Sequence, residues 1–232
     1  MNIIYSFQLD DRPPASFTIN IDDHTLTHQL PVRATLPTWT RLEHQRCPGC
    51  PLATTSAINC PMAESLVDLL EFSEKLDSFR PLAVTITTPE REIRTAVTAQ
   101  RAISALMGLL IATSGCPAVA WLRPMARFHL PLASEEETIY RAASMYLLAQ
   151  YFCEKHGQSP DWMMQGLRQR YQRLHEINIA MAERMRNAIE RDAPVNAVIL
   201  LDLFAKAMPY SVDDSLAELE YLFQPYLTGE NA

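Results

Sequence analysis

The chain has 232 residues, 48% of them hydrophobic, and a net charge of -7 at pH 7. This length can bury a sizeable core without covalent cross-links, so the five cysteines are not required as disulfides. The negative charge argues against nonspecific binding to nucleic acid, because such binding needs an excess of cations to neutralise the phosphates, and it leaves only a local basic patch open.

The start of the chain predicts a cytoplasmic protein. Residues 1–11 carry no lysine or arginine before their apolar stretch and include Asp10 and Asp11, which is the wrong pattern for a secretory signal. In the reducing cytosol, five cysteines with one Cys-x-x-Cys pair indicate ligands or reactive thiols before disulfides.

The amino-terminal part predicts a small antiparallel sheet. Residues 3–9 and 17–21 are rich in aromatic and β-branched residues and flank turn-forming residues at 10–14, which is typical of a hairpin. Residues 82–87 predict a further strand, so three or four strands are expected. The proline-rich segment 31–60 shows no sustained periodicity and predicts a loop that a bound metal would order.

Two helices are expected in the middle of the chain. Apolar spacing predicts one from Pro61 towards Pro81 and another over 98–113. The uncharged run 102–122 is long enough to cross a bilayer, but Gly115, Cys116 and Pro117 interrupt it. A buried core helix ending near Ser114 is therefore the favoured interpretation, and no membrane is expected as a partner.

The second half predicts helices throughout. Ser134 and Glu137 form a capping box, which predicts a helix from there to about Lys155, before Gly157. Further helices are expected over 161–191, 193–207 and 212–223. One stripe in the longest of them has heptad spacing and should be buried against another helix of the same chain. Its members are Leu167, Tyr171, Leu174, Asn178, Met181, Met185 and Ala188.

These elements predict an α+β fold with a small antiparallel sheet at the N-terminal side and a larger all-helical C-terminal part. A single domain over 1–232 is expected. Its 1–133 part would hold the hairpin, the cysteine loop and the mixed segment, and its 134–232 part would be helical.

Four of the five cysteines are followed directly by proline. With 16 prolines in 232 residues, chance would produce such a set in roughly one chain in ten thousand. Proline restricts the residue before it to extended conformations, which turns a cysteine outward from a loop. The four are Cys47, Cys50, Cys60 and Cys116.

A metal centre on these thiolates is the interpretation that the pattern favours. Cys-Pro ends the bacterial ferredoxin ligand run, which favours an iron-sulfur cluster such as 4Fe-4S. Zinc is the alternative, although Pro51 stands after Cys50, where zinc knuckles commonly have glycine. Incidental buried thiols at proline-rich turns are the rival without a metal. Cys153 lacks the proline and is expected in the core.

The fourth ligand has two candidates. Cys116 shares the Cys-Pro signature with the other three cysteines, and it follows Gly115, a helix C-cap residue that can redirect the chain. His44 precedes Cys47 by three residues and would make the centre a local clip. Cys116 is the predicted ligand.

The segment after Cys116 carries Arg123, Arg127 and His129, which we expect near the metal site. Two arginines and a histidine suit an anionic small-molecule ligand or proton transfer. The alternative is structural, with the arginines paired to the acidic residues at 135–137 and His129 hydrogen-bonded in the core.

Several motifs of the chain resemble an uncharacterised bacterial family of unknown function. They are Cys47-Pro48-Gly49-Cys50-Pro51-Leu52, Thr113-Ser114-Gly115-Cys116-Pro117, Pro124-Met125-Ala126-Arg127-Phe128-His129-Leu130-Pro131 and Met145-Tyr146-Leu147-Leu148-Ala149-Gln150-Tyr151-Phe152. The resemblance spans most of the chain and implies a bacterial cytosolic protein. It implies no activity, cofactor or catalytic residue.

The sequence thus predicts a metal-binding protein with a redox, sensing or Lewis-acid role on an unknown substrate. The alternative function is a noncatalytic binding or regulatory module in which zinc stabilises the long loop. An enzyme without a metal lacks support, because no nucleophile-elbow, phosphate-loop or dinucleotide-binding motif is present. Whether the chain is an enzyme stays open.

Overall fold

The computed structural model describes residues 1–9, 12–54, 57–73, 76–188, 194–199, 201–202, 205 and 216–229. The chain divides into two compact units: Met1–Leu132 with Glu176–Asp202, and Ala133–His175 with Leu203–Ala232. The first boundary falls where the helical part was expected to begin. The return of residues 176–202 to the first unit was not foreseen, and the single domain over 1–232 stays a prediction.

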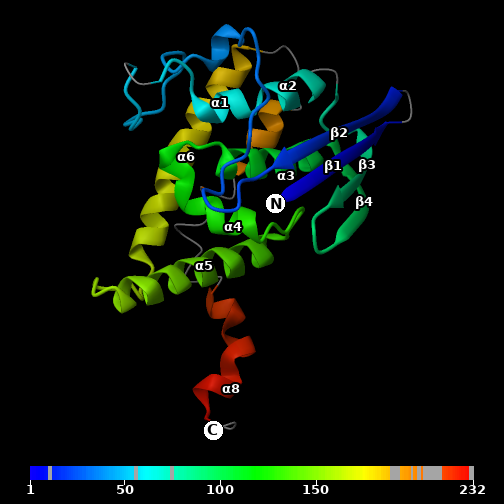
Figure 1. Ribbon diagram of the computed structural model, residues 1–232. Helices are drawn as coiled ribbons and strands as arrows, with labels where there is room; N and C mark the ends of the chain where they lie inside the picture. Colours follow the sequence, from blue (N-terminus) through cyan, green and yellow to red (C-terminus); the bar gives the residue numbers. More distant parts are fainter. Residues whose placement is uncertain are drawn as a thin grey trace. The chain divides into compact units, whose positions relative to one another are not determined.

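The predicted α+β class is confirmed by a four-stranded antiparallel sheet followed by a mostly helical region. The strands are β1 (Asn2–Leu9), β2 (Arg12–Asn20), β3 (Pro81–Thr87) and β4 (Glu92–Thr98). Their order across the sheet is β2-β1-β3-β4 (Figure 1). The amino-terminal strand therefore lies inside the sheet, between its hairpin partner and a strand from much later in the chain.

Two details of the sheet differ from the expectation. Pro13 and Pro14 lie inside β2 rather than in the turn, because β2 is an edge strand and its outer side needs no N–H for a neighbour. Strand β4 was missed by the sequence analysis. Its residues are only partly buried, so its apolar alternation is weak.

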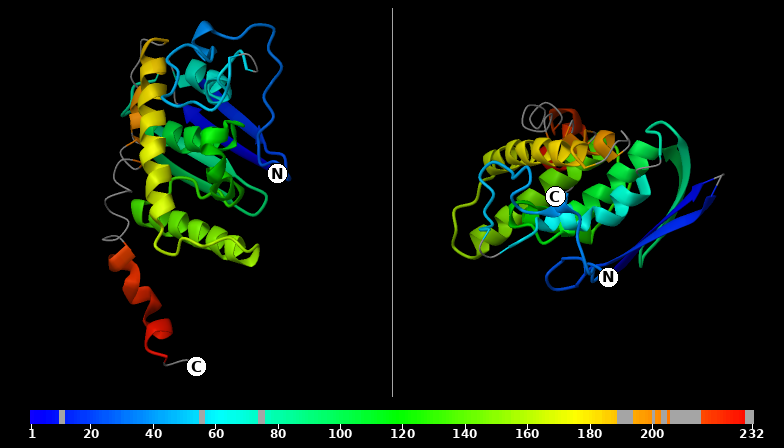
Figure 2. Two further views of the ribbon diagram at one scale, coloured as in Figure 1. Left: turned by 90° about the vertical axis from the view of Figure 1, so that its left-hand side faces the viewer. Right: turned by 90° about the horizontal axis from the view of Figure 1, so that it is seen from above.

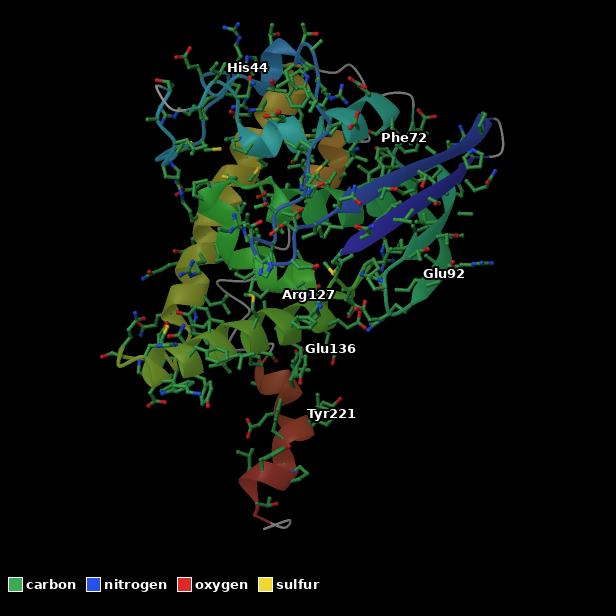
Figure 3. The ribbon with its side chains drawn as sticks, viewed as in Figure 1. His44, Phe72, Glu92, Arg127, Glu136 and Tyr221 are labelled. Carbon is green, nitrogen blue, oxygen red and sulfur yellow. The ribbon has the colours of Figure 1, made fainter. Side chains whose placement is uncertain are left out.

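One face of the sheet forms the core of the first unit. Ile3, Tyr5 and Phe7 of β1 point to this face and are almost fully buried. Helices α2 (Val67–Ser73) and α3 (Ala99–Thr113) cover it (Figure 2). The ring of Phe7 stacks on Phe72 of α2 at 5.2 Å between centroids, and Figure 3 shows Phe72 directed towards the hairpin.

The helix expected from Pro61 is two short helices, α1 (Pro61–Ser65) and α2. Helix α3 agrees with the prediction and buries most of its length. Among the described helices, none is by itself long and apolar enough to cross a membrane. Helix α3 and the following segment Pro117–Arg127 have that composition only jointly, and they meet at a bend of 112°.

The second unit contains the predicted capping box. Ser134 Oγ accepts from the N–H of Glu137, and the Glu137 carboxylate accepts from the N–H of Ser134. Helix α5 (Glu135–Lys155) begins there and ends before Gly157, whose φ is +76°. Cys153 on this helix is half-buried rather than in the core, because the last turns of the helix lie at the surface, and residues 151–157 are exposed except for Cys153 itself.

Helix α6 (Gln165–Arg186) begins later than expected because Asp161 anchors its start instead of entering it. The carboxylate of Asp161 accepts from the N–H of Gly166 at 2.7 Å and from the Tyr146 hydroxyl at 2.9 Å. These bonds hold the pKa of Asp161 below its usual value, the Gly166 N–H having the largest effect. Burial and the acceptor Asp161 raise the pKa of Tyr146 to about 12.

We predict that Asp161→Ala destabilises the protein by about 1 kcal/mol at pH 7, the usual cost of losing a capping carboxylate. Because the folded pKa of Asp161 is depressed, its contribution is fully present above the unfolded pKa of about 4 and is lost as the pH falls through the folded value. Urea unfolding at pH 7 and pH 3 measures this difference. Asp161→Asn, which does not titrate, should show a smaller change with pH than the wild type, and an equal change would contradict the assignment.

Six of the seven residues in the heptad stripe of α6 are buried within a single chain. The exception is Ala188, which lies just beyond the helix and is half-buried. That another helix of the same chain covers the stripe stays a prediction. The expected helices 193–207 and 212–223 fall partly outside the described residues, and the end of the chain forms η3 (Glu220–Phe223) and α8 (Gln224–Leu227).

Candidate metal centre

Cys47 and Cys50 lie on one tight turn. The N–H of Cys50 donates to the carbonyl of Cys47 at 3.1 Å. Pro48 occupies the second position of the turn, and Gly49 occupies the third with a φ of +55°, as in a type II turn. Arg46 braces the turn by donating to the carbonyl of Cys50. A turn of this kind brings the two cysteines to the same end of the loop.

Cys60 is joined to the earlier part of the same loop. Its N–H donates to the carbonyl of Thr40 at 2.8 Å, next to an isolated bridge between Arg41 and Asn59. Thr40 ends η1 (Thr38–Thr40), the only regular element that interrupts the described part of the predicted loop 31–60. The side chain of Cys60 is 5% exposed. Backbone pairing therefore closes the loop that carries Cys47 and Cys50.

Cys116 follows the carboxyl end of α3 and comes from a different part of the chain than the cysteine loop. Gly115 has a φ of +81° and redirects the chain at the end of that helix, as its C-cap pattern predicted. Cys116 then precedes η2 (Pro117–Leu122) in the same way that Cys60 precedes α1. Both cysteines have an extended backbone and a proline at the first helical position. Cys60-Pro61 and Cys116-Pro117 therefore have the same local backbone geometry, although they lie far apart in the chain.

The four thiols influence one another electrostatically. The pKa of Cys47 is raised to about 11, first by burial and then by the neighbouring thiols of Cys60 and Cys50, with a smaller effect from Cys116. The pKa of Cys116 is also raised, first by burial and then by Cys60 and Cys50, against the opposing effect of the nearby Ala118 N–H. The four Cys-Pro thiols therefore share one neighbourhood, although they come from three separate segments.

Arg184 of α6 lies in the same neighbourhood. Its side chain is 1% exposed and donates to the carbonyls of Arg41 at 2.7 Å and Gln45 at 3.4 Å, and also to Trp39. Burial lowers the pKa of Arg184, and its interactions with the thiols of Cys60, Cys47 and Cys50 raise it in return. The guanidinium therefore contacts the cysteine loop both through hydrogen bonds and through charge.

The side chains as they stand do not form a coordination shell. In the part of the chain that the structure describes, no three histidine, cysteine, aspartate or glutamate side chains come close enough together to hold a metal ion. All five cysteines are free thiols. The arrangement is a cluster of neighbouring thiols, and binding a metal would require their side chains to rotate towards one another.

His44 remains a rival ligand on local grounds. Its Nε2 atom is buried and has no hydrogen-bond partner, which leaves a ring nitrogen available. Figure 3 shows His44 and Arg127 well apart within the first unit.

The segment after Cys116 makes contacts at the start of the chain. It forms α4 (Arg123–Arg127) and the following turn. His129 Nε2 is 2.6 Å from the Tyr5 hydroxyl, and Arg127 contacts the sulfur of Met1 at 3.4 Å. Arg123 has a buried Nε without a hydrogen-bond partner. The proximity of this segment to the metal site stays a prediction, and the Tyr5 contact agrees with the structural alternative for His129.

Sequence reasoning missed two residues, Arg184 at the cysteine loop and His28 at the end of α3. Arg184 lies between stripe positions of α6, and nothing in the local sequence marks it. His28 donates from Nδ1 to the Thr113 hydroxyl, because that hydroxyl already donates to Leu109, and its Nε2 is buried without a partner. Burial lowers the pKa of His28, which favours the neutral ring. No sequence motif marks the contact of Arg184 with the cysteine loop or that of His28 with Thr113.

A family model described as "Domain of unknown function (DUF6901)" matches residues 3–224. No curated protein matches the chain, and no solved structure matches it.

Proposed function

Since the chain belongs to this family, whose description assigns no activity, we propose from the site itself that it is a metal-binding protein. The four Cys-Pro thiolates would hold an iron-sulfur cluster with a redox, sensing or Lewis-acid role. The observation that carries the proposal is that Cys60, Cys50 and Cys116 lie near enough to raise the pKa of Cys47, on a loop whose backbone the buried Arg184 holds by hydrogen bonds.

Thiol chemistry supports a metal rather than isolated thiols. Burial and the neighbouring thiols raise the pKa of Cys47 and of Cys116, so both are favoured in their neutral forms when no metal is bound. A bound metal reverses this preference, because each ligand then loses its proton and the cation offsets the thiolate charges. Metal binding is therefore expected to release protons and to stabilise the loop that carries Cys47 and Cys50.

A cluster is favoured over zinc for a local reason. Proline after each ligand withholds one backbone N–H and keeps the preceding cysteine extended. The glycine that shapes the second half of a zinc knuckle is replaced by Pro51. The alternative is a zinc-stabilised module without catalysis, in which the ion fixes the loop and the helices bind a partner.

A cytoplasmic location belongs to the same proposal. Free thiols persist most readily in a reducing compartment such as the cytosol, which suits a site built on four cysteines.

We predict that the protein purified without oxygen is brown and contains iron and acid-labile sulfide in similar amounts per chain. Elemental analysis and visible absorption measure this directly. The matched control is Cys153→Ser, which removes a thiol outside the site and should leave the metal content unchanged. Zinc without sulfide would select the alternative, and the absence of both metals from the freshly isolated and the reconstituted protein would refute the proposal.

A further inference from the structure

Helix α5 has a second apolar face besides the one that it buries. Ile139, Ala142 and Tyr146 belong to the buried face. Other large apolar side chains recur at helical spacing on a different face, where 46% to 57% of each side chain is exposed. They are Tyr140, Leu148, Tyr151 and Phe152. An apolar helix face of this size in water calls for a partner.

The C-terminal segment 216–229 adds a second exposed apolar surface. Every residue from 220 to 229 is exposed, and five of them are large and apolar, with exposed fractions between 41% and 85%. They are Tyr221, Leu222, Phe223, Tyr226 and Leu227. Helical pieces as short as η3 and α8 are not stable in water by themselves, so this segment also requires something to pack against.

These two surfaces adjoin within the second unit. A groove of about 470 Å³ lies between them, with Tyr140 and Leu147 on the side of α5 and Phe223 and Leu227 on the other. At roughly 200 Å² for a large side chain, the exposed parts of the nine apolar residues amount to roughly 1,000 Å². This exceeds the largest apolar patch of a typical monomer, about 300–600 Å², and the share of about 800 Å² that each partner buries in a stable complex.

The charges along α5 indicate which partner fits. Its first turn is acidic and its last turn contains Lys155. Glu137 and Lys155 are both exposed and are eighteen residues apart, which is about five helical turns, so they lie on one side of the helix, near Tyr151. Glu154 lies about 100° round the helix from Lys155. One helix cannot bring its two ends together, but an antiparallel copy of the same helix places each end opposite the other.

We infer that the second unit carries a homodimer interface, in which α5 packs antiparallel against α5 of a second copy and the C-terminal segments complete the apolar surface. Pairing centred at the level of Tyr146 places Glu137 opposite Lys155 and Tyr140 opposite Tyr151. Two-fold symmetry forms each of these contacts twice. The antiparallel arrangement also opposes the two helix dipoles favourably.

A membrane surface fits this region less well than a second copy does. The charged residues that accompany the apolar side chains of the C-terminal segment are acidic, Glu218 and Glu220, whereas helices that lie on membranes carry lysine and arginine on their polar face. The interface residues do not include the cysteines of the proposed metal centre, so the two proposals stand or fall separately.

The first test is sedimentation of the full chain from about 1 to about 100 μM, since an interface of this size gives a Kd in the micromolar range or below. The wild type should be a dimer. Leu148→Glu and Tyr226→Glu each place a charge in the interface and should raise the dimer Kd at least about a hundredfold and tenfold, respectively. Phe79→Glu is the matched control, because Phe79 is 75% exposed in the first unit, and it should leave the Kd unchanged.

A charge reversal tests the antiparallel arrangement. Lys155→Glu sets two pairs of like charges against each other in the dimer and should raise the Kd about tenfold. Adding Glu137→Lys to the same chain restores opposite charges and should recover most of the loss, an effect that a purely structural role of either residue would not produce. Because Glu137 also caps α5, circular dichroism must show that each variant keeps its helices.

A wild-type protein that remains monomeric at about 100 μM would overturn the inference. So would a dimer that either Leu148→Glu or Tyr226→Glu leaves unchanged, because the interface would then lie elsewhere. If Leu148→Glu does not fold, Tyr226→Glu decides, since Tyr226 is 85% exposed and its replacement does not disturb a core. No recovery in the folded double charge variant would refute the antiparallel packing of α5.

Discussion

Cys116→Ser is expected to abolish stable metal binding, whereas His44→Ala should retain the metal. Cys116 interacts electrostatically with Cys47, Cys50 and Cys60, and it has the same backbone geometry as Cys60. Loss of a supporting partner costs about 10- to 100-fold in metal affinity, so loss of a ligand should cost more. Metal and sulfide per chain in anaerobic protein measure the outcome.

The two variants also differ in their effect on stability. Ligation by Cys116 would tie the cysteine loop to the end of α3, so Cys116→Ser should lower the melting temperature of the metal-bound protein. Its effect on metal-free protein should be small, because serine is close to cysteine in size. Retention of metal in Cys116→Ser with loss in His44→Ala would establish His44 as the ligand. Retention in both would favour buried thiols without a metal.

Phe7→Ala is expected to destabilise the first unit by about 3–5 kcal/mol, the usual range for removing a fully buried phenylalanine. The side chain of Phe7 is 0% exposed, and its ring contacts Phe72 and Phe17 at centroid distances of 5.2 and 5.7 Å. Its removal leaves a cavity between the sheet and α2. Chemical denaturation measured at one metal loading gives the difference in the free energy of unfolding.

Phe79→Ala is the matched control, because Phe79 lies in the same unit with 75% of its surface exposed. Its effect should stay within about 0.5 kcal/mol. Equal destabilisation by the two substitutions would mean that the aromatic cluster of Phe7, Phe17 and Phe72 is not the core that the burial indicates.

Local signals predicted the elements whose stability depends on nearby residues. The capping box at Ser134 and the helix end before Gly157 were predicted correctly because a few adjacent backbone groups decide them. The hairpin and the third strand were also predicted from local composition. Strand β4 was missed, and Pro13 was misassigned to a turn, because an edge position depends on which strands pair.

The sequence by itself determined which residues could serve as ligands of the proposed metal centre, namely the four cysteines that precede a proline. Proline after a cysteine restricts the backbone directly, so the extended geometry of Cys60 and Cys116 follows from two adjacent residues. The sequence also identified the set of four thiols, since the Cys-Pro pairing is visible without a structure.

Only the tertiary structure decided which groups surround those thiols. Arg184 reaches the cysteine loop from more than one hundred residues later in the chain, and His129 meets Tyr5 across almost the same separation. Such contacts arise when helices and strands pack, and no spacing along the chain encodes them. The sequence therefore gave no sign that the guanidinium of Arg184 would be buried against the backbone of the cysteine loop.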